Sequence, residues 1–154
     1  MSPYLAAATL HREWAPDLTA ARLYALLRLR ADVFVVEQNL PFRDLDGRDI
    51  EPTTRHVWVE SSVSGDHLAC LRLLEEPDGS FRIGRVCTAP SVRGRGLARR
   101  VLEAAFADVG GSTCVVDSPV ATEGLFMIFG FQRVGEPFGS GGIPHVTLLR
   151  PGRA

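Results

Sequence analysis

Hydrophobic residues along this 154-residue chain recur with two periods, one typical of helices and one typical of strands. Leucines and a phenylalanine at helical spacing predict a helix over 17–36, with Asp17 as its N-cap. A second apolar stripe predicts a helix over 96–109, which ends at the Gly-Gly-Ser that follows it. A shorter apolar segment predicts a third helix over 122–129, ended by Gly130.

Short apolar runs bounded by turn residues predict six strands. They cover residues 55–60, 68–75, 81–87, 113–117, 131–134 and 145–149. The first three are joined by short turns and predict an antiparallel meander, whereas the fourth follows a helix and predicts a βαβ unit. A long polar loop spans 39–52, and a glycine-rich loop joins the last two strands. This order predicts one domain, 1–154, of the mixed α/β class, in which the meander leads into the βαβ unit.

Composition and charge argue against several classes of protein. A net charge of −1 argues against a nucleic-acid partner, which would require basic patches for phosphate contact. No apolar run is long enough to cross a bilayer, and the N-terminal residues lack the features of a signal peptide, so we expect a cytoplasmic protein without membrane contact. Cys70, Cys87 and Cys114 lack metal-ligand spacing and lie in apolar surroundings, so we expect buried free thiols and no metal site.

The stretch RVCTAPSVRGRGLARR, residues 85–100, combines several features of an anion-binding loop. Gly94 and Gly96 follow a predicted strand and open a predicted helix, where unpaired backbone N–H groups and the helix dipole favour an anion. Glycine lacks the Cβ that would keep a bulky phosphate away, and the nearby arginines can donate charge-assisted hydrogen bonds. A turn with solubilising charge is the alternative interpretation of the same residues.

Residues 93–98, RGRGLA, resemble the acyl-CoA loop of the GNAT N-acetyltransferases, written Q/R-x-x-G-x-G/A. The segment GLFMIFGF, 124–131, is similar to the short helix that borders the pantetheine arm in that family. The segment 23–51, with VFVVEQ and PFRDLDG, and the late GIPH look like the ElaA-like branch of the GNATs. The resemblance runs from about Leu23 to His145 and implies the GNAT acyl-CoA N-acyltransferase fold.

The resemblance also implies an acetyl-CoA-dependent N-acetyltransferase, in which an amine attacks the thioester directly. Backbone amides of the loop would hold the pyrophosphate, and exposed backbone of the preceding strand would pair with the pantetheine arm and polarise the thioester carbonyl. The CoA-binding residues implied in this way are Val86, Cys87, Thr88, Arg93, Gly94, Arg95, Gly96, Leu97, Ala98 and Arg99. Cys87 would contribute backbone groups only. The acceptor would be a small amine or a protein amino group.

The proton donor for the leaving thiolate is where the chain departs from the family. GNATs commonly carry a tyrosine in the downstream helix, and Phe126 takes that position here. Thr122 lies four residues before Phe126 on the same helix face, and Ser118 is close in sequence, so either hydroxyl could position a water. A thiol with a pKa of about 8.5 is also a tolerable leaving group without a dedicated acid. The two tyrosines, Tyr4 and Tyr24, lie in other segments.

The general base has several candidates, because the strand before the CoA loop lacks the glutamate that the family often carries there. They are Glu37, His56, Asp117 and His145. Histidine has the most suitable intrinsic pKa, and His145 belongs to the ElaA-like resemblance; a structural role at the start of a strand is the alternative. Glu37 could instead line an acceptor pocket for a cationic amine, or lie at a solvated helix end.

The acidic run in the 39–52 loop invites a calcium site, but Gly47 is the fourth residue from Asp44, whereas an EF-hand requires its glycine at the sixth position. We therefore expect no metal ion in this loop. Its carboxylates either line a site for an amine or belong to a plain acidic loop.

Two further functions are alternatives to an acetyltransferase. Phe126 and the missing strand carboxylate suggest a GNAT-fold CoA-binding module with weak or no catalysis. The early R-x-x-V-F of residues 30–34 resembles autoinducer synthases and suggests a different acyl-CoA or acyl-carrier enzyme, although VVEQ departs from that branch. Apolar residues in the C-terminal strands are compatible with a homodimer.

Overall fold

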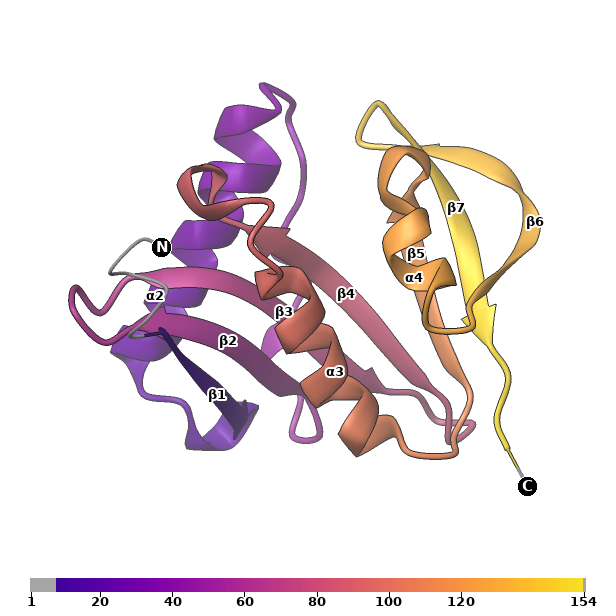
Figure 1. The fold of residues 1–154 in the computed structure, drawn as a ribbon, viewed down its shortest axis with the longest axis horizontal. Coiled ribbons are helices and arrows are strands. Elements are labelled where there is room, and N and C mark those ends of the chain that lie inside the picture. Colours follow the sequence, from indigo (N-terminus) through magenta and orange to yellow (C-terminus); the bar gives the residue numbers. More distant parts are fainter. Residues whose placement is uncertain (1–7, 154) are drawn as a thin grey trace.

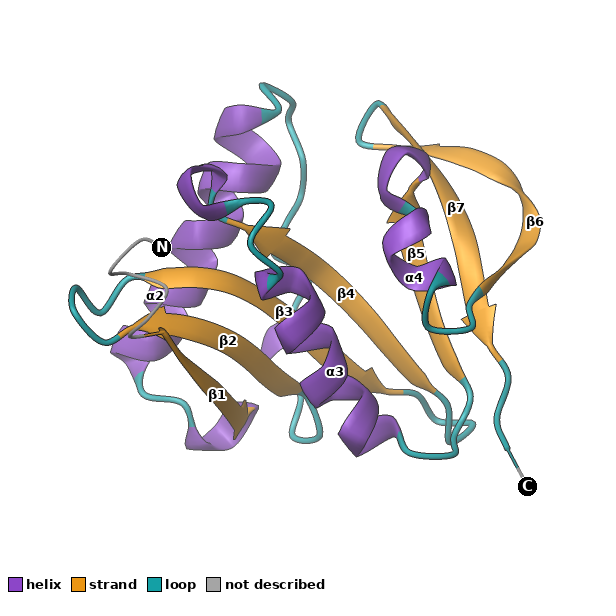
Figure 2. Ribbon diagram, viewed as in Figure 1, coloured by secondary structure: helices purple, strands orange, loops and turns teal. Residues whose placement is uncertain are grey.

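The computed structural model describes residues 8–153, which form a seven-stranded mixed sheet with three α-helices (Figures 1 and 2). The strands are β1 (Ala8–Trp14), β2 (Arg55–Ser61), β3 (His67–Glu75), β4 (Phe81–Thr88), β5 (Cys114–Pro119), β6 (Gln132–Ser140) and β7 (Ile143–Arg150). The helices are α2 (Ala20–Ala31), α3 (Leu97–Val109) and α4 (Gly124–Met127). A π-helical turn, η2 (Asp32–Glu37), continues α2. None of the helices in this range is long and apolar enough to cross a membrane.

The strand order in the sheet is β1-β2-β3-β4-β5-β7-β6. Strands β1 to β4 pair antiparallel, and β4 pairs parallel with β5 through the crossover helix α3. The predicted meander and βαβ unit are therefore confirmed. Strands β5, β7 and β6 then continue the sheet in antiparallel pairs.

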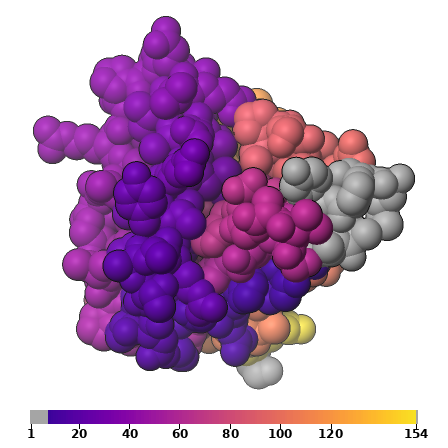
Figure 3. Space-filling view, turned by 90° about the vertical axis from the view of Figure 1, so that its left-hand side faces the viewer, coloured from indigo at the N-terminus to yellow at the C-terminus, as the bar shows by residue number. Residues whose placement is uncertain are grey.

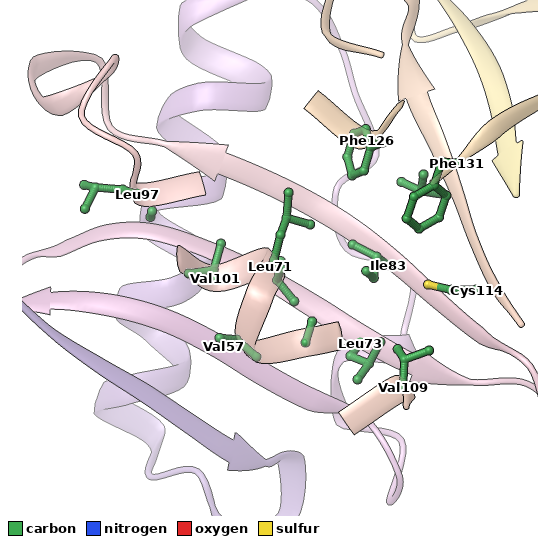
Figure 4. Packing of buried hydrophobic residues seen from close by; sticks show 14 of the residues in the cluster. Val57, Leu71, Leu73, Ile83, Leu97, Val101, Val109, Cys114, Phe126 and Phe131 are labelled. Carbon is green, nitrogen blue, oxygen red and sulfur yellow. The ribbon is translucent and has the colours of Figure 1, made fainter. Parts of the chain in front are cut away.

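Helices cover both faces of the sheet. On one face, Leu97, Val101 and Val109 of α3 pack against apolar side chains of β2, β3 and β4, as Figure 4 shows. On the other face, Leu26 and Leu29 of α2 pack against a separate cluster that contains Trp58, Cys70 and Cys87. Figure 3 shows the molecule from the left-hand side of Figure 1. The N-terminal part of the chain, in indigo and violet, forms one side of the surface in this view. Because both faces are covered, the ends and gaps of the sheet are the places where a ligand can enter.

The strands β4 and β5 separate after a short stretch of pairing. Only residues 81–83 of β4 have partners in β5, and the two strands then diverge toward the upper end in Figure 1. In β4, Arg85 adopts φ +54°, and the register with β3 shifts between Cys70 and Arg72, as at a β-bulge. The bulge bends β4 away from β5 and leaves its later backbone groups without a strand partner on that side.

Several predicted elements differ from the observed ones. Strand β1 was not predicted, because it is an edge strand with mixed polar and apolar residues and no clear alternation. The N-cap of α2 is Thr19, whose hydroxyl accepts from the Arg22 N–H at 3.2 Å, so the prediction of Asp17 is wrong. Helix α4 is a single turn instead of the helix predicted over 122–129.

The last two strands are longer than predicted. The segment predicted as a glycine-rich loop extends β6 and β7 and turns at Gly141 and Gly142, which adopt φ +60° and +81°. Glycine and proline in β6 predicted a loop, because both are rare inside strands. They are tolerated here because β6 is an edge strand.

Candidate active site

A cleft of about 340 Å³ lies where β4 and β5 separate. One wall comes from β4 and the start of α3, the other from β5, α4 and β7, and the π-helical turn η2 closes one side. The residues that line the cleft include Phe34, Phe42, Arg85, Val86, Cys87, Thr88, Arg93, Ala98, Asp117, Ser118, Thr122, Phe126, Gly141 and His145. Most residues implied by the sequence as functional therefore lie around one cavity.

The loop before α3 lies beside the cleft, between Arg93 and Ala98, which both line it. Gly94 and Gly96 have φ +75° and +78°, which only glycine adopts without strain, and no atom lies within 4 Å of a Cβ built on either residue. Gly96 is the N-cap of the 13-residue α3, and no side chain caps that terminus. The first turn of α3 therefore has free N–H donors and open space, which suits a pyrophosphate.

The backbone of Val86, Cys87 and Thr88 forms the β4 wall of the cleft. The Cys87 side chain points toward α2, where its Sγ lies 3.6 Å from the Cys70 Sγ. The hydrogen bond with Cys70 and burial raise the pKa of Cys87, so the thiol is a poor nucleophile. All three cysteines are free and buried, as predicted.

Arg93 connects the CoA-type loop to the end of η2. Its guanidinium donates two hydrogen bonds of 2.6 Å to the Glu37 carboxylate, and its Nε donates to the Thr88 carbonyl at 3.1 Å. The hydrogen bond from Arg93 lowers the pKa of Glu37. This geometry makes Glu37 a weak base and leaves little of its charge for a cationic acceptor.

His145 is the histidine whose ring lines the cleft. It lies on β7 opposite Pro119 of β5, and its ring stacks on Phe138 with centroids 6.0 Å apart. The Nδ1 atom lies 2.8 Å from the Ile143 carbonyl oxygen, so Nδ1 carries the proton and donates. The lone pair is therefore on Nε2, the arrangement that a general base requires.

The other two base candidates are engaged elsewhere. His56 is 1% exposed, and its Nε2 lies 2.8 Å from the Asp49 carbonyl oxygen; burial lowers its pKa. Asp117 lines the cleft but accepts hydrogen bonds from Arg82 at 3.0 Å and Thr147 at 2.7 Å.

Phe126 occupies the α4 side of the cleft, 3% exposed, with its ring edge-on to Phe131. The hydroxyls nearest to it in the chain are those of Ser118 and Thr122, whose oxygens are 3.5 Å apart and which both interact with the Pro119 carbonyl. Tyr24 is exposed on α2, and Tyr4 lies outside the described residues.

A cluster of ion pairs beneath the cleft was not predicted. It joins three arginines and three aspartates: Arg30, Arg72, Arg85, Asp44, Asp46 and Asp49. The aspartates belong to the acidic loop, so that loop is neither a plain solvated segment nor an acidic lining. One signal was available in the sequence, since Arg30 falls among the apolar positions of α2. Within residues 8–153 no three His, Cys, Asp or Glu side chains form a group that could hold a metal ion.

Comparisons with known proteins agree with this geometry. The family model described as acetyltransferase (GNAT) domain matches residues 56–148. A UPF0039 protein of Mycobacterium tuberculosis is 48% identical over 146 residues, which cover 93% of each chain. An acyl-CoA N-acyltransferase from Pseudomonas aeruginosa has a similar structure, with a TM-score of 0.84 at 34% identity over 93% of this chain and 99% of that one.

The protein ElaA of Escherichia coli is 33% identical over 147 residues, which cover 87% of this chain and 90% of its own. Its crystal structure also gives a TM-score of 0.84. The chain therefore belongs to the GNAT acetyltransferases and, among them, to the UPF0039/ElaA relatives.

Proposed function

We propose that the protein transfers an acetyl group from acetyl-CoA to an amine. The observation that carries this proposal is the cleft between β4 and β5, which is lined by strand backbone of β4 without a partner in β5, by Ala98 in the first turn of α3 and by His145. These are the parts that acyl transfer needs: a site for the phosphates, a support for the thioester and a base for the amine.

Acetyl-CoA would lie along β4. Backbone N–H groups of Gly94 to Arg99 would bind the pyrophosphate, with Arg95 and Arg99 near it. The backbone of Val86 to Thr88, which lacks a strand partner in β5, would pair with the pantetheine arm, and one of its N–H groups would donate to the thioester oxygen as negative charge develops there.

The amine nitrogen would attack the thioester carbonyl carbon and form the amide bond. His145 Nε2 would accept the proton that the nitrogen loses, the bond from carbon to sulfur would break, and CoA thiolate would leave. The thiolate would take a proton from water positioned by Thr122 or Ser118, because Phe126 has none to give, and the proton that His145 releases would neutralise the hydroxide that remains. A thiol pKa of about 8.5 makes this departure possible without a strong acid.

Acetylation of a panel of amines, with release of free CoA thiol as readout, tests the proposal. His145→Gln keeps a polar side chain but lacks the base, so we expect kcat to fall about 100-fold or more while acetyl-CoA still binds. Unchanged kcat in this variant would remove His145 from the mechanism. Phe138→Leu is a companion variant that removes the stacking partner of the ring without removing the base.

A CoA-binding module with little catalysis is the second candidate, and the buried Phe126 is the observation that favours it. Binding of acetyl-CoA without acetylation of any amine in the panel would support the module and exclude the transferase.

A further inference from the structure

The charged groups around the cleft limit which acceptor can bind. The carboxylates that could attract a cationic amine are all paired with arginines. Glu37 accepts two hydrogen bonds from Arg93, and Asp117 accepts one from Arg82. The acidic loop contributes three aspartates to a cluster with three arginines, so this cluster has no net charge.

Within this cluster of ion pairs, Arg85 has one guanidinium nitrogen that donates no hydrogen bond to the described residues. Its Nε lies 2.9 Å from an Asp44 carboxylate oxygen, and its Nη2 donates to the Asp44 carbonyl at 3.1 Å. Its Nη1 donates no hydrogen bond to any of the residues 8–153. Nη1 is not fully buried, so solvent reaches it. The side chain lines the cleft, 20% exposed.

The chain holds Arg85 firmly in this position. Its backbone adopts φ +54°, which is rare for a residue with a long side chain and occurs at the bulge of β4. The Phe42 ring lies against the guanidinium, 5.0 Å from its centroid to Cζ. Asp44 and Phe42 come from one loop, so that loop and the bulge together hold the guanidinium at the wall of the cavity.

The same loop restricts the size of the acceptor. Phe42 packs so closely on the β6–β7 turn that a Cβ on Gly141 would lie 3.2 Å from its ring. This contact bridges the two sides of the cleft. A cavity of about 340 Å³ is near the lower end for ligand sites, and it must also hold the thioester end of CoA.

We infer that Arg85 binds a carboxylate of the acceptor, so that the acceptor is a small amino acid-type molecule, with the carboxylate on Arg85 and the amine near His145 Nε2. This inference rests on the proposed function. Phe34 and Phe42, whose centroids are 6.1 Å apart, provide an apolar wall for the rest of the molecule. Burial and the neighbouring Arg72 lower the pKa of Arg85, and an added anion would offset both effects.

Matched acceptors test this inference on the wild-type protein. Each free amino acid is compared with its carboxamide and with the amine that lacks the carboxyl group, using kcat/KM for CoA release. The carboxamide has the less basic and so more available amine, which alone would favour it. We expect the free acid to be better by about 10-fold or more, the usual effect of one charge-assisted hydrogen bond. Equal or better rates with the neutral compounds would overturn the inference and leave the acetyltransferase in place.

Two variants test whether Arg85 is the source of the preference for the free acid. In Arg85→Gln the preference for the acid should fall to one or below, because the amine of the carboxamide is the more available one, while the carboxamide is still acetylated. Arg12→Gln, at the far edge of the sheet, should keep the preference. A preference that persists in Arg85→Gln would overturn the inference. Circular dichroism checks the fold of the variant, and the wild-type comparison stands even if the variant does not fold.

Calorimetry separates this inference from the proposed function. Titration of an N-acetyl amino acid, and of its amide, into the protein with CoA measures carboxylate recognition without turnover. Tighter binding of the acid with no acetylation of any amine would refute the transferase and keep the Arg85 site. Equal binding of acid and amide would overturn the Arg85 site.

Discussion

Replacing Arg30 with methionine should destabilise the fold by about 3–5 kcal/mol, the usual cost of removing one partner from a buried ion pair. Arg30 is 1% exposed, and its guanidinium donates to Asp44 at 3.0 Å and to Asp49 at 2.6 Å. Methionine fills much of the same volume, so the loss would come from charge and hydrogen bonds and not from a cavity. The variant would leave three aspartates, of which Asp44 and Asp49 are buried, against two arginines.

The structure favours the lower end of that range. Arg72 still contacts Asp49, and Arg85 still contacts Asp44, so neither carboxylate is left without a cation. A loss of about 3 kcal/mol corresponds to a fall in Tm of about 6–12 °C for a domain of this size. Urea unfolding followed by circular dichroism measures the loss. Arg99→Met is the control, because its exposed ion pair should contribute less than about 1 kcal/mol.

A loss below about 1 kcal/mol in Arg30→Met would refute the view that this cluster stabilises the fold. The double variant Arg30→Met/Asp49→Asn gives a second check. It removes the excess carboxylate together with the arginine, so it should be more stable than the single Arg30→Met variant. If the double variant is less stable than the single one, charge imbalance is not the cause of the loss.

Three further predictions concern individual side chains. Glu37→Gln should keep kcat within about threefold, because the pair with Arg93 makes Glu37 a weak base; a 100-fold loss in steady-state kinetics would contradict this. Burial lowers the pKa of His56 and of His67, so the stability that these neutral rings contribute is present above a pH of about 6.5 and is lost as the pH falls. Urea unfolding at decreasing pH should show this loss. His56→Gln should reduce the dependence of the unfolding free energy on pH. Burial raises the pKa of Cys114 to about 11, so a thiol reagent should modify it only after unfolding, and rapid modification of the folded protein would contradict its burial.

The sequence predicted the central part of the fold because local signals and topology agree there. The three-strand meander and the helix that follows β4 have clear periodicity and clear turns. The two glycines before α3 predicted open space for an anion at a helix start, and no atom lies within 4 Å of a Cβ built on either of them. Strand β1 and most of β6 were missed, because their stability comes from pairing with a neighbouring strand and not from apolar alternation.

The candidate site was predicted less well, since side-chain partners depend on residues far apart in the chain. His145 and Thr122, which were predicted as candidate catalytic residues, both line the cavity. The pairing of Glu37 with Arg93 spans 56 positions, and no local pattern indicates it. The acidic loop shows the same limit, because its aspartates gain their role from arginines on α2, β3 and β4.

Titration calorimetry with acetyl-CoA tests the central claim, that the cleft between β4 and β5 binds this co-substrate. We predict saturable one-to-one binding to the wild type and none to Gly96→Glu, whose carboxylate would occupy the open space before α3. Gly79→Glu is the matched control, because Gly79 also has a positive φ and open surroundings but lies in the β3–β4 turn. It should bind like the wild type. No binding to the wild type at millimolar acetyl-CoA, or equal binding to Gly96→Glu, would contradict the account.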